Sequence, residues 1–543
     1  MIDSLKKALF EIKRKSFRNA VKIIVFIREA VIFTLLIASL SLSAASLWIS
    51  REFESATAEQ IIFHLLMPIN GAEEGVIKNF LINCAIVPFF IAALFYFLGH
   101  DFSKKKILQE QSGKQRFSTA KIWFAFRKPF IQFRYFLSVA IAVCSFTFIY
   151  FHSGLNKLAA HVYNEKEFSS FYEDNYVFLN KNQNIFRQDK RNLIVLYIES
   201  LESSFASIEE GGIFETGLIP EITQMAQANI NFSHNNKIGG YKQLKGTNWT
   251  VAGLIATMCG VPLRIPFAEN SYDRYKYFLP GAVCLTDILA ANNYNISFLM
   301  GSQKNFAGVD IFLETHANIS AKDLNYFRDS GKIKKDYHRG KWGVEDSKLY
   351  DLAKEELLNL SAQEEPFALF MMTIDTHMSD EFLDQRICEK NNERERKYID
   401  VMRCASLQLN RFTKWISRQK FFKNTAVVVL GDHLSMNKKI FPKGKGRKVF
   451  NLFINSKWRP KKIKNRYFSH FDMFPTILAA LGARLDNKGA ALGRSLFHDE
   501  KTLLEKTSAK EVNENIMRRS KIYDCFLFKK NDSCRPPIKA GRS

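Results

Sequence analysis

The segment that best indicates the fold is Ala426-Val427-Val428-Val429-Leu430, which is followed directly by Gly431-Asp432-His433. A short continuous apolar run that ends in polar residues predicts a buried strand. The same part of the chain contains four more such runs: Leu193–Ile198, Ile296–Met300, Phe367–Ile374 and Val449–Ile454. Helical patterns fit between and after them, as over Ser347–Leu360 and Asp472–Leu481. Strands that alternate with helices predict an α/β fold with a mostly parallel central sheet.

Polar residues follow four of these strands at the point where each strand ends. They are Glu199-Ser200, Gly301-Ser302-Gln303, Asp375-Thr376-His377 and Gly431-Asp432-His433. Open α/β sheets bind ligands at the carboxyl ends of their strands. The four strand ends together therefore predict an active site along one edge of the sheet.

Composition and charge narrow the class of protein. The chain has 543 residues, of which 47% are hydrophobic and 24% are charged, and this excludes a disordered or low-complexity protein. Its net charge of +24 fits either a nucleic-acid binder or a protein that faces anionic lipid. Much of the charge flanks apolar runs near the N-terminus, and no aromatic-basic binding motif is present. We therefore expect a membrane, and no nucleic acid, among the partners.

Three apolar runs near the N-terminus predict about three transmembrane helices. They are Ala30–Ile49, Leu81–Gly99 and Tyr135–Phe151, and each is near the roughly 20 residues that cross a bilayer. Basic residues cluster before the first run and between the second and the third, whereas the loop between the first two is acidic. Because basic loops stay on the cytoplasmic side, we expect the N-terminus inside and the chain after Phe151 outside. Buried core helices are the alternative interpretation.

This pattern divides the chain into four expected parts. They are a membrane domain over 1–152, a linker over 153–190, a catalytic domain over 191–500 and a C-terminal tail over 501–543. The short apolar piece Ile61–Met67 fits either an interfacial segment or a buried loop helix. A cleaved signal peptide is not expected, because the first apolar run starts late and is long.

The cysteines predict disulfides in the outer part of the chain. Six of the eight lie there, in an oxidising compartment. Their nearness in sequence favours the pairs Cys259–Cys284, Cys388–Cys404 and Cys525–Cys534, with free buried thiols as the alternative. Cys84 and Cys144 fall inside expected membrane spans and are expected to be lone thiols. Since no Cys-x-x-Cys pair occurs, a zinc ribbon is not expected.

Three residues at the strand ends have the chemistry of metal ligands. Asp432 and His433 offer an oxygen and a nitrogen atom, and Glu199 offers a carboxylate. Mixed oxygen and nitrogen donors suit zinc or manganese. Taken singly, the Asp-His pair also fits a turn, and Glu199 also fits a solvated strand end.

A nucleophile is expected near that metal, and Thr250 is the candidate. It lies in the segment Gly246-Thr247-Asn248-Trp249-Thr250-Val251-Ala252-Gly253, at the start of a helix-like run. A hydroxyl at a helix start lies near backbone N–H groups that hold phosphate, and metal coordination lowers its pKa. The hydroxyl could then attack at neutral pH. A helix N-cap is the alternative role for Thr250, and Asn248-Trp249-Thr250 is also a glycosylation sequon.

An ordered set of motifs resembles the sulfatase-like alkaline phosphatase superfamily. Within it, the chain is most similar to bacterial phosphoglycerol transferases of periplasmic glucans, and lipoteichoic acid synthases and lipid A phosphoethanolamine transferases are similar relatives. The resemblance spans about Asn192 to Phe497. The motifs that carry it are the segments 195–200 and 246–263, Trp342-Gly343-Val344, Asp375-Thr376-His377, Gly431-Asp432-His433 and the segment 470–476.

This resemblance implies site residues. It makes Thr250 the nucleophile and makes Glu199, Thr250, Asp432 and His433 the ligands of a divalent metal, zinc or manganese. It also implies substrate contacts from three further residues, Trp342, His377 and His470. For His470, a structural or second-metal role is the alternative.

The resemblance also implies a reaction and a location. A phosphoglycerol or phosphoethanolamine head group would pass from a membrane phospholipid donor, through a phospho-threonine, to a glycan acceptor. That acceptor would be lipopolysaccharide or a periplasmic glucan. The chain would be a multi-pass protein of the bacterial inner membrane, with its catalytic domain in the periplasm.

Three positions depart from the family pattern. Glu345 stands where glucan-type enzymes usually have His, Gly431 stands where they often have Ser, and Met378-Ser379 replaces a second His or a Pro. The metal and nucleophile residues stay intact, so the departures concern the head group and the acceptor. The likeness around Thr250 favours phosphoglycerol over phosphoethanolamine.

Two other functions compete with the transferase. One is a metal-dependent phosphodiesterase or sulfatase-type hydrolase of the same fold. Sulfatases use Cys or Ser in Cys/Ser-x-Pro-x-Arg, and the segment from Cys259 to Arg264 is one residue too long for that motif. The other is a sensor or scaffold, which predicts loss of the metal ligands, although all are present. Basic residues after His433 fit either an anionic partner or a solvated loop: Lys438, Lys439, Lys443, Lys445, Arg447 and Lys448.

Overall fold

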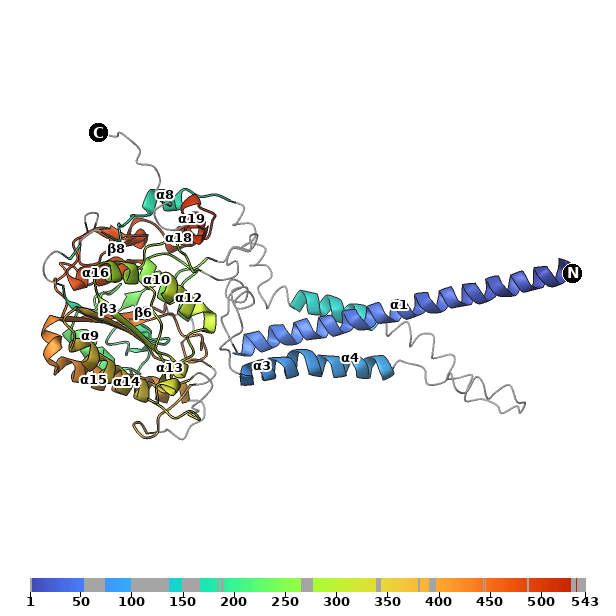
Figure 1. Cartoon of the computed structure of the whole chain (residues 1–543), viewed down its shortest axis with the longest axis horizontal. Helices are drawn as coiled ribbons and strands as arrows, with labels where there is room; N and C mark the ends of the chain where they lie inside the picture. Colours follow the sequence, from blue (N-terminus) through green and yellow to red (C-terminus); the bar gives the residue numbers. More distant parts are fainter. Residues whose placement is uncertain are drawn as a thin grey trace, which may run out of the picture. The chain divides into compact units, whose positions relative to one another are not determined.

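The chain divides into two compact units, Met1–Glu52 with Glu74–Lys157, and Phe53–Glu73 with Leu158–Ser543. The structure is a computed structural model, drawn in Figure 1. The residues that it describes are 2–52, 74–98, 136–148, 167–182, 185–186, 190–264, 277–337, 343–378, 381–389, 397–442, 444, 446–485, 488–528 and 534.

The N-terminal unit contains two helical stretches that are long and apolar enough to cross a membrane. The first, Phe26–Ile49, belongs to α1 (Ile2–Glu52), which contains no Gly or Pro that would interrupt it. The second, Ile77–Leu94, runs through the consecutive helices α3 (Glu74–Leu81), η1 (Ile82–Ile86) and α4 (Val87–Leu98). In both stretches few side chains are buried, as expected for surfaces that face lipid.

The third expected span is only partly described. A shorter apolar helix covers Phe136–Phe148. The piece Ile61–Met67 and the basic loop before the third span lie outside the described residues. Two spans are therefore supported by length and composition, and the orientation remains a prediction.

A six-stranded sheet forms the centre of the C-terminal unit, in the order β2-β6-β5-β1-β4-β3. The central strand β1 runs parallel to β4 and to β5, and β3 runs parallel to β4. β6 is antiparallel to both of its neighbours, β5 and the edge strand β2. The predicted mostly parallel sheet is thus confirmed. The strands are β1 (Asn192–Ile198), β2 (Gly240–Tyr241), β3 (Asn295–Met300), β4 (Phe367–Met372), β5 (Thr425–Gly431) and β6 (Val449–Ile454).

Helices cover both faces of this sheet (Figure 1). Successive residues of β1 point to opposite faces, so Leu193, Val195 and Tyr197 enter one core and the residues between them enter the other. The first core is covered by α10 (Thr250–Cys259), α11 (Leu285–Ala291), α12 (Val309–Thr315) and α16 (Met473–Leu481). The second is covered by α9 (Pro220–Ala228), α13 (Leu324–Asp329), α14 (Asp346–Ser361) and α15 (Lys397–Ser417).

Segments from the expected linker and tail also enter the first core. α8 (Phe171–Asn175) lies in the expected linker, and α17 (Leu503–Lys506), α18 (Ala509–Ile516) and α19 (Lys521–Phe528) lie in the expected tail. The buried Tyr523 hydroxyl donates to the Pro262 carbonyl at 2.7 Å and accepts the Arg264 N–H at 2.9 Å. The C-terminal segment therefore packs against the loop that follows α10.

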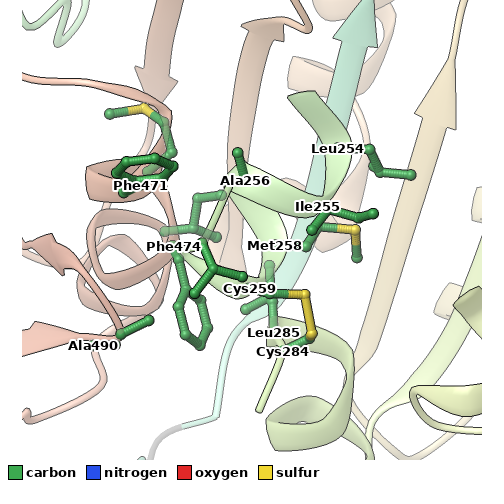
Figure 2. Packing of buried hydrophobic residues seen from close by; sticks show 14 of the residues in the cluster. Leu254, Ile255, Ala256, Met258, Cys259, Cys284, Leu285, Phe471, Phe474 and Ala490 are labelled. Carbon is green, nitrogen blue, oxygen red and sulfur yellow. A yellow bond between two sulfur atoms is a disulfide. The ribbon is translucent and has the colours of Figure 1, made fainter. Parts of the chain in front are cut away.

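All three expected disulfides are present: Cys259–Cys284, Cys388–Cys404 and Cys525–Cys534. Figure 2 shows the first of them, which joins the last residue of α10 to the residue before α11. It lies in the same buried core cluster as Leu285 and Phe474 of α16. Cys84 and Cys144 are free, as expected.

Candidate active site

The ends of the adjacent strands β1 and β5 bring three candidate ligands together. Ile198 pairs with Gly431 in the parallel register, so the next residues, Glu199 and Asp432, leave the sheet side by side. The ligand atoms of Glu199, Asp432 and His433 all lie within 4.8 Å of one another, and all three residues are buried. His433 Nε2 is 3.4 Å from Glu199 Oε1 and 3.4 Å from Asp432 Oδ2.

Thr250 adds a hydroxyl to this cluster. It is the first residue of α10, whose N-cap residue Trp249 makes no side-chain cap. Thr250 Oγ1 lies 3.4 Å from Glu199 Oε2 and 3.3 Å from His433 Nε2. The structure thus brings the four predicted residues to one place.

Hydrogen bonds orient these side chains toward the centre of the cluster. His433 Nδ1 donates to the Leu434 carbonyl at 2.9 Å, so the lone pair of Nε2 faces the other ligands. Asp432 Oδ1 accepts the N–H groups of Ser200 and His433, each at 2.8 Å. Among the described residues, the buried Asp432 Oδ2 has no hydrogen-bond partner. One carboxylate oxygen and one imidazole nitrogen are therefore directed toward the same point.

The electrostatics of the cluster fit a bound cation. Burial, followed by repulsion from Glu199, raises the pKa of Asp432 to about 7. Burial alone would lower the pKa of His433, but the charges of Asp432 and Glu199 outweigh it and raise that pKa overall. In the described part of the chain no Lys or Arg pairs with these two carboxylates. Two buried carboxylates, an imidazole and a hydroxyl are donors that zinc and manganese accept.

Hydrogen bonds from neighbouring residues hold Glu199 in position, and the sequence alone did not predict most of them. Ser200 adopts φ of 57°, uncommon for a residue other than Gly, and its hydroxyl donates to Glu199 Oε1 at 2.7 Å. Thr376 donates to the Glu199 carbonyl at 2.6 Å, and Thr373 accepts the Glu199 N–H at 3.0 Å. Only adjacency to Glu199 marked Ser200 in the sequence.

Two glycines permit close approaches beside the site. A Cβ atom on Gly253 would lie 2.2 Å from the Asp432 carbonyl oxygen, so α10 reaches the ligand loop only without a side chain there. A Cβ atom on Gly431 would lie 2.0 Å from the Leu201 carbonyl oxygen. This contact gives a physical reason for Gly at position 431, where the resembled enzymes often have Ser.

The other predicted site residues have different locations. His377 lines a cavity beside Thr250, whereas Trp342 lies outside the described residues. His470 is fully buried, and its Nε2 donates to the Asp432 carbonyl at 2.8 Å. Burial lowers the pKa of His470 to about 3, so the ring is neutral at pH 7. This position supports the alternative structural role for His470, and substrate contact by it remains a prediction.

The cavity beside Thr250 is formed at the ends of β1, β3 and β4, as the strand-end pattern predicts. Its polar groups include Glu199, Thr250, Thr373 and His377, and most of the remaining lining is apolar. An apolar pocket with a few convergent polar groups is typical of a small-molecule site. The remaining lining residues are Trp249, Val251, Met300, Ser302, Phe306, Ala307, Val309, Met372, Ile374 and Met436.

A second buried acid, Glu202, anchors the loop that follows His433. Arg447 forms an ion pair with Glu202, and Arg447 Nη2 donates to the Ser435 carbonyl at 2.7 Å. Glu202 Oε1 accepts the Ser435 N–H at 2.8 Å, and Arg447 lies over the Phe441 ring. Arg447 therefore binds groups of the protein itself and is not available to attract an anion. Of the other basic residues expected to attract an anion, Lys443 and Lys445 lie outside the described residues.

Comparison with known proteins gives three findings. The Sulfatase family model matches residues 191–483, which is more than half of the chain and includes all four clustered residues. Phosphoglycerol transferase I of Xanthomonas campestris pv. campestris is 32% identical over 322 residues, which cover 58% of this chain and 43% of the relative. Phosphoglycerol transferase I of Escherichia coli O127:H6 is 32% identical over 255 residues, which cover 46% and 31%. The chain spans less than half the length of these curated relatives.

Two solved structures are also similar. A lipoteichoic acid synthase from Listeria monocytogenes has a TM-score of 0.45 at 14% identity, covering 64% of this chain and 80% of that one. The integral membrane protein lipooligosaccharide phosphoethanolamine transferase A from Neisseria meningitidis has a TM-score of 0.47 at 14% identity, covering 83% and 84%. On the extent of the family match, the chain belongs to the sulfatase family.

Proposed function

We propose that this chain is a membrane-anchored, metal-dependent phosphotransferase that uses Thr250 as its nucleophile. The position of the Thr250 hydroxyl, 3.4 Å from Glu199 Oε2 and 3.3 Å from His433 Nε2, carries the proposal. A threonine that only caps a helix would occupy the N-cap and accept an N–H of its own first turn. Thr250 is instead the first helical residue, and its hydroxyl faces the candidate metal ligands.

The chemistry follows from the four clustered residues. Zinc or manganese held by Glu199, Thr250, Asp432 and His433 would supply Lewis-acid charge, which lowers the pKa of the hydroxyl and offsets charge on a phosphoryl group. Thr250 Oγ1 attacks the phosphorus atom of the phospholipid, and the bond from phosphorus to the diacylglycerol oxygen breaks. Diacylglycerol leaves with a proton, and the head group stays on Thr250 as a phosphodiester.

The second step transfers the head group to the acceptor. A hydroxyl oxygen of a glycan attacks the same phosphorus atom and loses its proton, while Thr250 Oγ1 leaves and regains one. Thr250 is the first residue of α10, so the first-turn N–H groups of this helix would lie next to a phosphate on Thr250, and Trp249 places no side-chain cap over them. These N–H groups would stabilise the phosphate oxygens in both steps.

The proposed substrates follow from the relatives and from the organisation of the chain. The names of the curated relatives support phosphoglycerol as the head group, with phosphoethanolamine as the runner-up. The acceptor would be a sugar of lipopolysaccharide or of a periplasmic glucan. Two apolar helices support an anchor in the bacterial inner membrane, and three disulfides support a periplasmic location for the C-terminal unit.

A sulfatase reaction at Cys259 is not supported. This residue is bonded to Cys284 and buried, so it offers no thiol for conversion to an aldehyde. A phosphodiesterase that uses water as the acceptor shares the same first step. The products separate it from a transferase.

The test is the intact mass of the purified full chain after incubation with phosphatidylglycerol or phosphatidylethanolamine and the metal. We expect a mass gain on the wild type, whose size identifies the head group, and no gain on Thr250→Ala. Thr250→Ser is the matched control, since it keeps a hydroxyl, and it should still form the adduct. A metal-loaded wild type that forms no adduct with either lipid would overturn the proposal, and release of the head group into water alone would favour the hydrolase.

A further inference from the structure

Two segments that include β2 and β6, at one edge of the central sheet, contain no acidic residue. Residues 222–264 have four Lys and Arg residues, residues 434–471 have twelve, and neither segment has an Asp or a Glu. At the opposite edge, residues 295–337 include β3 and have six Lys and Arg residues and five Asp and Glu residues. The β2–β6 edge therefore has a large excess of positive charge that the β3 edge lacks.

The tertiary structure brings cations of both segments together. Lys242 directly follows β2 and Lys448 directly precedes β6, and the antiparallel register places them at the same end of the two strands. Burial, followed by the charge of Lys242, lowers the pKa of Lys448, so the two like charges repel each other. Lys464 Nζ donates to the Lys237 carbonyl at 2.8 Å. Six cations of these segments, here called the basic edge, are Lys237, Lys242, Lys448, Arg459, Lys462 and Lys464.

The cations of the basic edge have no carboxylate partner within the described ranges of the chain. Two other cations of the same segment do have one. Lys461 pairs with Asp499 at 3.3 Å, and Arg466 pairs with Glu505 at 2.6 Å. Because neighbouring like charges on paired strands are destabilising, a surface that retains them without carboxylates indicates an anionic partner.

Two exposed aromatic side chains lie in the same segment. Trp458 is 39% exposed and precedes Arg459, and Tyr467 is 57% exposed. The next residue, Phe468, accepts the Lys242 N–H at 2.8 Å, which places Tyr467 beside the cations of the other segment. Trp and Tyr are enriched where a membrane meets water, and surfaces that bind anionic bilayers combine such rings with Lys and Arg. The exposed rings therefore favour a lipid surface over a small soluble anion.

The basic edge extends to the loop that holds the candidate metal ligands. Gln243, the residue after Lys242, accepts the Leu434 N–H at 2.7 Å through Oε1, and Leu434 directly follows His433. An anionic surface bound at Lys242 would therefore lie beside the end of β5.

We propose that the basic edge docks the C-terminal unit on a bilayer that contains anionic phospholipid, with Trp458 and Tyr467 at the level of the lipid head groups. The cations attract the anionic head groups, and the two rings occupy the boundary between head groups and acyl chains. The chain also contains two apolar stretches long enough to cross a membrane, so a bilayer is a partner that it can reach. Docking requires no chemistry at Thr250, so its test is separate from that of the proposed function.

The experiment uses photochemical cross-linking of the full chain in lipid nanodiscs. The photoreactive residue benzoylphenylalanine replaces Trp458 or Tyr467, and the mass of the irradiated protein shows whether a lipid has been attached. Tyr326 of α13 is the matched control position, because it is 43% exposed and lies in the segment that contains β3. With phosphatidylglycerol in the nanodisc we expect lipid adducts at positions 458 and 467 and none at 326. With phosphatidylcholine alone we expect few adducts at any position.

A pair of charge variants tests the electrostatic part of the docking. Arg459→Glu combined with Lys462→Glu should lower the lipid adduct at position 467 about tenfold, because two exposed cations near the anionic surface are reversed. Lys334→Glu combined with Lys335→Glu is the matched control, since it makes the same charge change at exposed residues of the segment that contains β3. It should leave the adduct unchanged. The comparison of the two lipid compositions uses one protein, so it does not depend on the folding of a charge variant.

Three results would overturn the docking surface. They are no lipid adduct at either position, equal adducts at Tyr326, and adducts that do not depend on head-group charge. Attachment of a polysaccharide or a protein in place of lipid would also overturn it. If lipid is attached as expected while no phospho-threonine forms, the proposed function fails and the docking surface stands.

Discussion

Glu199 and Glu202 lie three residues apart after the same strand, and both are buried, yet their surroundings differ. Glu202 forms an ion pair with Arg447 and accepts the Ser435 N–H at 2.8 Å. Glu199 faces a second carboxylate, a histidine and the Thr250 hydroxyl, with no Lys or Arg partner in the described part of the chain.

The difference separates a structural acid from a candidate catalytic one. Burying a carboxylate is costly unless a cation or several hydrogen bonds compensate for the lost water. At Glu202 the protein itself supplies the compensation. At Glu199 the compensation is incomplete, so the folded chain retains a place for a cation. Burial alone therefore does not identify the site, whereas burial beside a second carboxylate and a histidine, without a Lys or Arg partner among the described residues, does.

The largest expected effect is that of Glu199→Gln on catalysis. Removing one carboxylate from the four-residue cluster should weaken metal binding and slow adduct formation about 1000-fold, because charge on the phosphoryl group is no longer offset. Elemental analysis of the purified protein and the rate of adduct formation check this. Stability in the presence of a chelator should not fall, since a charge that repels Asp432 is removed. Full metal content in the variant would contradict the assignment.

The next effect is that of Glu202→Gln on stability. It leaves Arg447 buried without its carboxylate, and this should lower the free energy of unfolding by about 3 kcal/mol. Denaturant unfolding measures the change, and a double-mutant cycle with Arg447→Met isolates the pair. The folded variant should still bind metal. If it lost metal as Glu199→Gln does, the contrast between the two acids would be wrong.

The smallest effect is a pH dependence at Asp432 in the metal-free chain. The folded-state pKa of about 7 lies above the value of about 3.9 for an unfolded chain, so the folded state binds more protons between these pH values. The protonated carboxyl contributes stability below about pH 4, and this contribution is lost as the pH rises through about 7. With a chelator present, the wild type should lose on the order of 2 kcal/mol relative to Asp432→Asn between pH 5 and pH 8. Unfolding curves at each pH test this, and a constant difference would refute it.

The sequence predicted the architecture because apolar runs and helical periods are local patterns that specify strands and helices. Continuous apolar runs predicted five strands, and two helical patterns predicted α14 and α16 nearly to their ends. Polar residues at the carboxyl ends of parallel strands predicted the meeting of Glu199 and Asp432, since a parallel register aligns those ends. Nearness in sequence predicted the three disulfides. Thr250 was predicted as the nucleophile because a hydroxyl at the start of a helix lies near backbone N–H groups that hold phosphate, and because the family resemblance places it there.

The sequence could not predict contacts between segments that are distant along the chain. Glu202 and Arg447 form a buried ion pair although 245 residues separate them along the chain. No local pattern in the sequence indicates that either residue has this partner. His470 lies in the turn directly before α16, where its side chain contacts the Asp432 carbonyl and does not line the cavity beside Thr250. The expected linker and tail contain too little local pattern to show that Tyr172 and Tyr523 are core residues.

Local sequence patterns thus specify the strands, the apolar N-terminal helices, and the candidate nucleophile and ligands. These features depend on residue type, hydrophobic period and position relative to a strand end, all of which are local. Tertiary packing, in contrast, determines that Glu202 pairs with Arg447 while Glu199 does not pair with a Lys or Arg among the described residues, and that Gly253 permits α10 to reach Asp432. Those features depend on how distant backbones approach one another, and that is set by the packing of the whole core.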